Sequence, residues 1–205
     1  MTAIKKATLY YVYDPMCSWC WGYKPTWEKV KQGVNDHVDI TYVLGGLAPD
    51  SDVAMPIDMQ KQIASYWKKI EEYLGTEFNY DFWTKNTPRR STYPACRALL
   101  AARAQGAEET MLTAIQKAYY LDAQNPSDNE TLIQLAGELN LDLDAFKKML
   151  VAQETQNTLL REIQFARSIG GNSFPSLFIE KEGSVTELKI DYQDEAATIK
   201  AILLP

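Results

Sequence analysis

The sequence predicts a mixed α/β protein in which a block of helices interrupts a strand-containing frame. Two strand-like segments flanking a helical one open the chain, helical hydrophobic spacing follows, and two more strand-like segments and a helix close it. The expected order is strand, helix, strand, helical block, strand, strand, helix. The second half has too few strands for a domain of its own. We therefore expect residues 55–169 to be an insertion into one domain formed by residues 1–54 and 170–205.

The first three elements form one βαβ unit. Residues 6–14 are rich in β-branched and aromatic side chains, which favours a buried strand. A helix is expected to begin near Cys17, and Pro25 lies inside it, where a proline kinks a helix. Residues 38–44 place apolar side chains at alternate positions, which predicts a second strand that a Gly-Gly pair terminates. These lengths fit a right-handed parallel crossover.

The long middle part of the chain has the hydrophobic period of helices. We expect five or six helices and no strand between residues 55 and 169. One should carry Pro94 in its first turn, and another should begin with Ser127 and Glu130 in capping-box spacing. The helical segments are expected at residues 56–75, 91–106, 107–122, 126–140, 142–150 and 155–171.

The last part of the chain predicts a hairpin and a closing helix. Two strands should meet at a turn containing Glu182 and Gly183, and residues 194–204 should be helical. A proline at the start of the third strand could adopt the cis form and expose the backbone of Phe174 beside the helix that carries Cys17. An ordinary trans Pro175 at the first position of a strand is the alternative.

Composition and charge argue against several classes of function. The formal net charge is -6, whereas nucleic-acid binding relies on clustered Lys and Arg. The doublets Lys5-Lys6 and Arg89-Arg90 are expected to be solvated surface. The N-terminal stretch does not resemble a secretory signal, and no apolar run has the length of a membrane span. We therefore expect a cytoplasmic protein with neither nucleic-acid nor membrane partners, in a compartment where structural disulfides are unusual.

Cys17 and Cys20 are separated by two residues where the first strand passes into a helix. The free N–H groups and the dipole of a helix N-terminus favour an anion. There, the pKa of a cysteine can fall from about 8.5 into the range of roughly 3.5 to 7.5. The spacing therefore predicts Cys17 as the attacking thiolate and Cys20, one turn later, as the thiol that resolves the mixed disulfide.

Two other interpretations of the cysteine pair remain open on the sequence alone. A closed zinc site needs four ligands, and the chain adds only Cys96 and the single histidine, His37. A carboxylate or a second chain would have to complete such a site, so no metal is expected. The pair could also fill a core, since free cysteines are often buried. Cys96 itself is expected to be a small buried side chain, and His37 to lie on the surface.

Three neighbours of the pair have alternative roles. Trp19 or Trp21 could offer an apolar platform to a substrate, or could pack against the helical block. Asp14 is expected mainly to form the turn with the following proline. A carboxyl group three residues before Cys17 could also influence thiol ionisation or accept a proton.

The segments DPMCSWCWG and FARSIGGNSFPSLFI resemble the DsbA family of thioredoxin-fold oxidoreductases, and most closely its cytoplasmic FrnE-like branch. The resemblance implies a thioredoxin-like fold (βαβ…ββα) with a large all-helical insertion between the second and third strands. The residues to which it assigns roles are Cys17 (nucleophile), Cys20 (resolving thiol), Pro175 (cis-proline), Phe174 (backbone offered to substrate) and Pro25 (helix proline). Ser18-Trp19 replaces the Pro-His pair of periplasmic DsbA, so strong oxidising power is not implied.

The function expected is that of a thiol:disulfide oxidoreductase or isomerase acting on disulfide- or thiol-containing proteins or small molecules. It should need no bound cofactor, and glutathione is a redox partner to consider. One alternative is a glutathione-dependent isomerase or transferase of the kappa and hydroxychromene-carboxylate isomerase type. Members of that type commonly carry serine at the position of Cys17, although Gly45-Gly46-Leu47 resembles them. Another alternative is a non-enzymatic module that binds a partner or a metal. The oligomeric state is not predicted.

Overall fold

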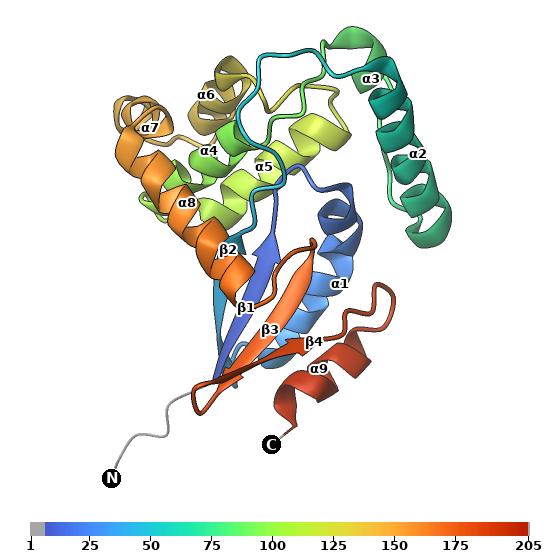
Figure 1. Ribbon diagram of the computed structural model, residues 1–205, viewed down its shortest axis with the longest axis vertical. Helices are drawn as coiled ribbons and strands as arrows, with labels where there is room; N and C mark the ends of the chain where they lie inside the picture. The colour runs from blue at the N-terminus through green and yellow to red at the C-terminus, as the bar shows by residue number, and fades with distance from the viewer. Residues whose placement is uncertain (1–6, 205) are drawn as a thin grey trace.

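The computed structural model describes residues 7–204 and confirms the predicted α/β class (Figure 1). Lys6, the expected first residue of the opening strand, and the Lys5-Lys6 doublet lie outside the described residues. The strands are β1 (Ala7–Tyr13), β2 (Val38–Leu44), β3 (Ser176–Lys181) and β4 (Ser184–Leu188). The helices α1 (Ser18–Val34) and α9 (Glu195–Leu203) complete the frame.

The four strands form one sheet in the order β2-β1-β3-β4. β1 and β2 are parallel, with Tyr13 opposite Leu44, as a crossover through α1 requires. β3 is antiparallel to both β1 and β4. The β3–β4 turn lies at Glu182 and Gly183, as predicted, and both residues have positive φ, 51° and 82°, which a type I′ hairpin turn requires.

Alternate side chains of β1 enter two different cores. Tyr11 belongs to the larger core, where its ring stacks on Trp27 of α1 with 4.4 Å between centroids. Val12 belongs to a smaller core with Phe178 of β3 and Ala166, which lies in the last helix before β3. Figure 1 shows α1 and α9 on one side of the sheet and that last helix on the other. Because both faces are packed, the carboxyl end of β1 is a firm support for the residues that follow it.

Seven helices occupy the described chain between β2 and β3, one more than the upper limit expected. The additional helix, α3, is a single turn, too short to show a hydrophobic period. Figure 1 shows α3 to α7 beyond the ends toward which β1 and β2 point. No described helix combines the length and apolar character needed to cross a membrane. The helices are α2 (Ile57–Leu74), α3 (Phe82–Lys85), α4 (Tyr93–Arg103), α5 (Glu108–Tyr120), α6 (Asn129–Glu138), α7 (Leu143–Leu150) and α8 (Gln153–Ser168).

The predicted capping box at Ser127 and Glu130 is wrong. Asp128 occupies the N-cap position of α6, and no side chain caps that helix. The hydroxyl group of Ser127 instead donates a hydrogen bond to the carbonyl oxygen of Ser91 at 2.6 Å. Ser127 is buried, so its hydroxyl satisfies a distant backbone carbonyl rather than the nearest helix end. The spacing of the two residues could not reveal this partner.

An aromatic cluster anchors α2 to the rest of the helices. Trp67 of α2 is fully buried. Its ring stacks on Phe78 with 5.0 Å between centroids and meets Tyr119 and Tyr120 of α5 edge to face, at 5.5 Å and 5.4 Å. Aromatic pairs in these geometries stabilise a core beyond the area that they bury.

We expect Trp67→Ala to lower the free energy of unfolding by about 3 to 5 kcal/mol, because it removes a large core ring and leaves a cavity. Urea denaturation followed by circular dichroism measures the loss. The matched control is Tyr73→Ala in the same helix, where the side chain is 49% exposed; a change within about 0.5 kcal/mol is expected for such a surface position. Similar losses in the two variants would contradict the role of Trp67 as the anchor.

Candidate active site

Cys17 lies between the carboxyl end of β1 and the first turn of α1. Its backbone is extended, with φ −81° and ψ 116°, and it occupies the N-cap position of the helix. Its carbonyl oxygen accepts a hydrogen bond from the backbone N–H of Trp21 at 3.1 Å. The side chain makes no capping bond, so its sulfur is left free to meet other groups.

The thiol of Cys17 faces the loop that leads into β3. Its Sγ donates a hydrogen bond to the carbonyl oxygen of Phe174 at 3.4 Å. The peptide bond between Phe174 and Pro175 is cis, one of the two forms considered from the sequence. These residues are far apart in the chain but meet because β1 and β3 are neighbours in the sheet.

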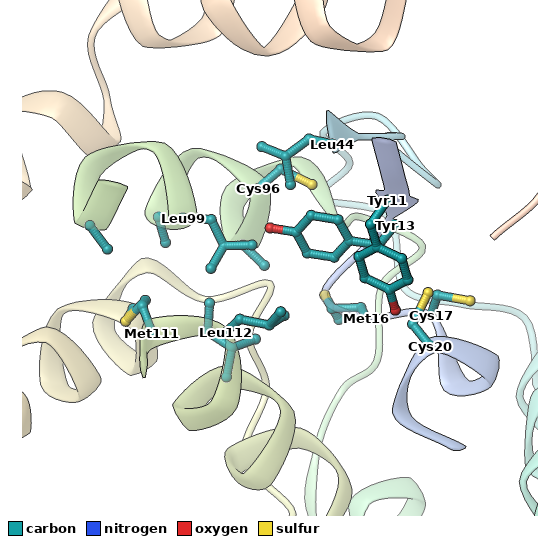
Figure 2. Close-up of a cluster of buried hydrophobic side chains, with 14 of the residues drawn as sticks. Tyr11, Tyr13, Met16, Cys17, Cys20, Leu44, Cys96, Leu99, Met111 and Leu112 are labelled. Atoms are coloured by element: carbon teal, nitrogen blue, oxygen red, sulfur yellow. The ribbon is translucent and has the colours of Figure 1, made fainter. Parts of the chain in front are cut away.

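Cys20 lies one turn into α1, and only 1% of it is exposed, against 8% of Cys17. Figure 2 shows the two cysteines beside each other, at the edge of the buried cluster that contains Tyr11, Tyr13 and Met16. Burial, followed by hydrogen bonding to Cys17, raises the pKa of the Cys20 thiol well above its usual value. The pair therefore consists of an outer sulfur and an inner one that keeps its proton.

The carboxyl group of Asp14 is completely buried behind this pair. Its Oδ1 accepts a hydrogen bond from the backbone N–H of Met16 at 2.9 Å, which is the expected turn. Its Oδ2 accepts hydrogen bonds from the backbone N–H of Leu47 at 2.7 Å, the hydroxyl of Thr92 at 2.7 Å and the thiol of Cys96 at 3.6 Å. Burial raises the pKa of Asp14, and the hydrogen bonds to its carboxyl oppose that shift.

The partners of Asp14 reach beyond what the sequence predicts. Thr92 lies next to the first residue of α4, and Cys96 lies within that helix, so the carboxyl group joins the cysteine-bearing turn to the helical block. No local sequence pattern predicts these contacts, because the two partners follow Asp14 by 78 and 82 positions.

The other metal-binding side chains lie apart from the cysteine pair. Cys96 is buried, as predicted, and Figure 2 shows it away from Cys17 and Cys20. Burial, followed by the charge of Asp14, raises the pKa of its thiol well above the usual value. His37 is exposed, as predicted. Among residues 7–204, no three or more His, Cys, Asp or Glu side chains are grouped to hold a metal ion.

A cavity of about 260 Å³ opens beside Cys17. Its lining comes from the first turn of α1 and the turn before it, the loop after β2, helix α2, residues 89–92, α5 and the loop before β3. Its lining residues include Trp19, Leu47, Met55, Ile63, Tyr66, Arg90, Tyr119 and Phe174. The cavity therefore combines apolar side chains with the Arg90 guanidinium group next to the outer sulfur.

The structure distinguishes the two tryptophans of the motif. Trp19 lines the cavity beside Cys17. Trp21 instead stacks on Tyr120 of α5, with 5.6 Å between ring centroids, and its indole N–H donates to the carbonyl oxygen of Glu77 at 3.1 Å. Pro25 lies within α1 and lines a separate, larger cavity of about 540 Å³ together with Trp21.

Among the side chains of the cavity wall that sequence analysis missed are Arg90 and Tyr119. Arg90 is exposed, as predicted, and it lines the cavity that contains Cys17. The prediction of solvated surface is wrong for Arg89, which is half-buried and pairs with Asp128. Tyr119 is buried, and burial raises the pKa of its hydroxyl, while the charge of Arg90 acts in the opposite direction. The sequence around Arg90 and Tyr119 does not predict that either residue lines the Cys17 cavity, because this position depends on how the helical block packs against β1 and α1.

Comparisons with known proteins agree with this architecture. A protein-family model described as thioredoxin matches residues 10–201. A solved structure of a Nitrosomonas europaea protein assigned as a protein disulfide isomerase is similar over 97% of this chain and 96% of its own, with a TM-score of 0.84 and 24% identity. The cytosolic disulfide reductase DsbM from Pseudomonas aeruginosa is similar over 89% of each chain, with a TM-score of 0.75 and 24% identity. Identities of this size show a shared fold.

One relative found by sequence comparison is named as an adapter protein rather than as a disulfide reductase or isomerase. The ClpXP adapter protein SpxH from Bacillus subtilis is 28% identical over 177 residues, which are 84% of this chain and 58% of the relative. The chain thus spans less than two thirds of the length of that relative.

The buried carboxyl group generates a prediction about pH. Because the pKa of Asp14 is raised in the folded state, the folded protein keeps this proton over a pH range in which the unfolded chain has lost it. The resulting stabilisation is complete below the ordinary Asp pKa of about 3.9 and disappears as pH rises through the raised value. Asp14→Asn removes the titration and also loses hydrogen-bond acceptors, so it should destabilise the protein by an amount that shrinks as pH rises.

Urea unfolding at a series of pH values measures this difference. Asp122→Asn is the control, because Asp122 is exposed and a substitution at a surface position is expected to change stability by no more than about 0.5 kcal/mol. A stability gap between wild type and Asp14→Asn that is constant with pH would contradict the raised pKa.

Proposed function

Because the chain belongs to the thioredoxin family, we propose that it is a thiol:disulfide oxidoreductase that exchanges disulfides through Cys17 and Cys20. One observation carries this proposal: an outer thiol at a helix N-cap adjoins both a buried second thiol and a cavity of about 260 Å³. Trp19, Phe174 and Pro175 are proposed to contact the substrate. The position of Cys17 at the N-terminus of α1 supports the proposal, because the free N–H groups and the dipole of a helix N-terminus favour an anion.

The proposed reaction transfers two electrons in two exchanges. The Cys17 thiolate attacks one sulfur of a substrate disulfide, so that a new S–S bond forms, the old one breaks and the departing thiolate takes up a proton. Cys20 then loses its proton and attacks Cys17, which releases the second substrate thiol and leaves a Cys17–Cys20 disulfide. Two external thiols, oxidised to their own disulfide, return the pair to the dithiol form.

The burial of Cys20 supports this order of events. A protonated inner thiol does not compete with Cys17 for the incoming disulfide. The proximity of the two thiols allows Cys20 to attack once Cys17 is in the mixed disulfide. Since thiols of the cytosol are kept reduced, we propose a cytoplasmic protein that reduces or isomerises disulfides. The solved relative DsbM, described as a cytosolic disulfide reductase, supports that direction.

Replacing each cysteine separately tests the proposal. We expect Cys17→Ala to reduce insulin reduction to the uncatalysed rate, because no other residue is proposed to attack the disulfide. We expect Cys20→Ser to accumulate a mixed disulfide with substrate, visible by mass spectrometry, because the resolving sulfur is gone. Equal rates for wild type and Cys17→Ala would refute the proposed function.

We propose glutathione, or another small thiol that bears carboxylates, as the redox partner of the pair. Arg90 and Tyr119 on the cavity wall support this choice, because a guanidinium group binds carboxylates through a fork of donors. The Pseudomonas relative has also been solved with GSH. The cationic wall lies on the same cavity as Cys17, so an anchored thiol would present its sulfur to the reacting one.

We expect Arg90→Gln to raise the KM for glutathione disulfide about tenfold, since a hydrogen bond to a charged group contributes about 1.5 to 3 kcal/mol. The KM for hydroxyethyl disulfide, which carries no charge, should stay unchanged. Steady-state kinetics with both disulfides measure the contrast, and Arg90→Lys, which retains the charge, should give an intermediate value. Equal changes for the two disulfides would contradict carboxylate recognition by Arg90.

Glutathione binding by a variant that lacks both thiols distinguishes the proposed function from that of a kappa-type isomerase or transferase. Saturable, stoichiometric glutathione binding by a Cys17→Ala, Cys20→Ala double variant, together with no disulfide exchange by wild type, would favour that alternative.

A second candidate function is that of a partner-binding adapter. The similarity to SpxH over 84% of the chain favours it. Val53 and Ile57, which are 74% and 62% exposed, offer apolar surface near the residues that line the Cys17 cavity. Association with purified ClpXP that persists without both cysteines would support this role, and it would not exclude exchange chemistry at the same site.

A further inference from the structure

Arg167, in the last turn of α8, joins three segments, one of which carries the Phe174 carbonyl that meets Cys17. Its guanidinium group donates hydrogen bonds to the carbonyl oxygen of Gly45 at 3.0 Å and to that of Gly171. The guanidinium carbon also lies 5.3 Å from the centre of the Phe174 ring. One side chain thus contacts the residue after β2, the residue that ends the turn after α8, and the loop before β3.

The Phe174 ring packs against Gly45. The guanidinium group of Arg167 contacts the same ring. A Cβ atom added to Gly45 would lie 1.9 Å from this ring, a distance at which the ring would have to move. Only glycine therefore leaves room at position 45. The ring also packs against the small core of Val12 and Phe178. With its ring fixed in this way, Phe174 has little freedom to move its backbone.

The backbone of Phe174 is the part that faces the reacting sulfur. Its carbonyl oxygen accepts the hydrogen bond from the Cys17 thiol at 3.4 Å. When Cys17 enters a mixed disulfide it has no proton to donate, and the same oxygen becomes available to an N–H group of the substrate. A buried or half-buried carbonyl that loses its donor gains by finding another.

We propose that Arg167 is a positioning residue for disulfide exchange, holding the Phe174 carbonyl where it meets first the Cys17 thiol and then the backbone of a peptide substrate. This inference deepens the proposed function and rests on it. Arg167 does not touch the reacting sulfur itself. It acts through Phe174, from a helix that belongs to the helical block rather than to the frame carrying Cys17.

Arginine suits this role better than lysine does. The guanidinium group is planar, so its edge donates to two carbonyl oxygens while its face contacts an aromatic ring. A lysine ammonium is a compact charge that lacks a flat face. Replacement by lysine should therefore loosen the loop despite conserving the charge.

The test compares a peptide disulfide with a disulfide that has no backbone N–H. The two substrates are a fluorescent disulfide-linked peptide and hydroxyethyl disulfide. For Arg167→Lys and Arg167→Met, we expect the KM for the peptide to rise about threefold to tenfold, the size of one lost hydrogen bond of about 0.5 to 1.5 kcal/mol. The kcat for the peptide and both constants for hydroxyethyl disulfide should change less than about twofold.

Two further variants make the result specific. Gly45→Ala displaces the Phe174 ring from a different segment and should give the same selective rise in peptide KM, with Arg167 intact. Arg161→Met on the same helix is the control, because the Arg161 side chain is 62% exposed and pairs with Glu154 within α8. It should leave both substrates unaffected. Circular dichroism and urea unfolding confirm that each variant is folded.

The possible outcomes separate this inference from the function on which it rests. A wild-type protein that is inactive on both disulfides overturns the proposed function, and the inference with it. An active wild type whose Arg167 variants keep the peptide KM overturns the inference alone. Equal losses for the two substrates also overturn it, because they would show that Arg167 supports the folded structure in general.

Discussion

The buried carboxyl group of Asp14 is the contact on which the arrangement of the site depends. Its hydrogen-bond donors come from the turn before α1, the loop after β2 and the start of α4. An unpaired polar group in this position would cost roughly 2 to 7 kcal/mol, and a charged one more. The three segments therefore stabilise one another, because movement of any one of them would remove a hydrogen bond from the buried carboxyl group.

The positions of the two sulfurs follow from this junction. The turn that Asp14 stabilises passes directly into Cys17 and the first turn of α1, so Cys17 remains at the edge of the core. Cys20 must then point inward, because one helical turn places it on the same face, against Tyr11 and Tyr13. The difference in burial between the two neighbouring thiols thus follows from where β1 ends, from the turn that Asp14 stabilises and from the position of Cys20 one helical turn later. In the proposed exchange, this difference separates the attacking sulfur from the resolving one.

Local patterns predicted the frame well and the contacts between distant segments poorly. Alternation identified β2, and the turn residues identified the β3–β4 hairpin, because both signals lie within a few residues. The spacing of the two cysteines and the proline that precedes β3 are also short signals, and each predicted a residue at the same end of the sheet. By contrast, α3 was too short to show a period, Ser127 bonds to Ser91 instead of capping a helix, and the partners of Asp14 and Arg167 lie on other elements. These contacts depend on how the helical block docks, which no short pattern encodes.

The division of the chain between frame and helical block corresponds to a division of chemical tasks. The two sulfurs and the Phe174 carbonyl come from the turn after β1, helix α1 and the loop before β3. Much of the cavity wall comes from the helices instead, through Ile63 and Tyr66 of α2 and Tyr119 of α5. Substitutions in these helices can therefore alter which molecule reaches Cys17 while leaving the distance between the sulfurs intact. Like the hydrogen bonds of Asp14, Arg167 connects the two parts, because it belongs to α8 and yet contacts the loop that carries the carbonyl. Movement of α8 would consequently be transmitted to Cys17 through Arg167 and Phe174.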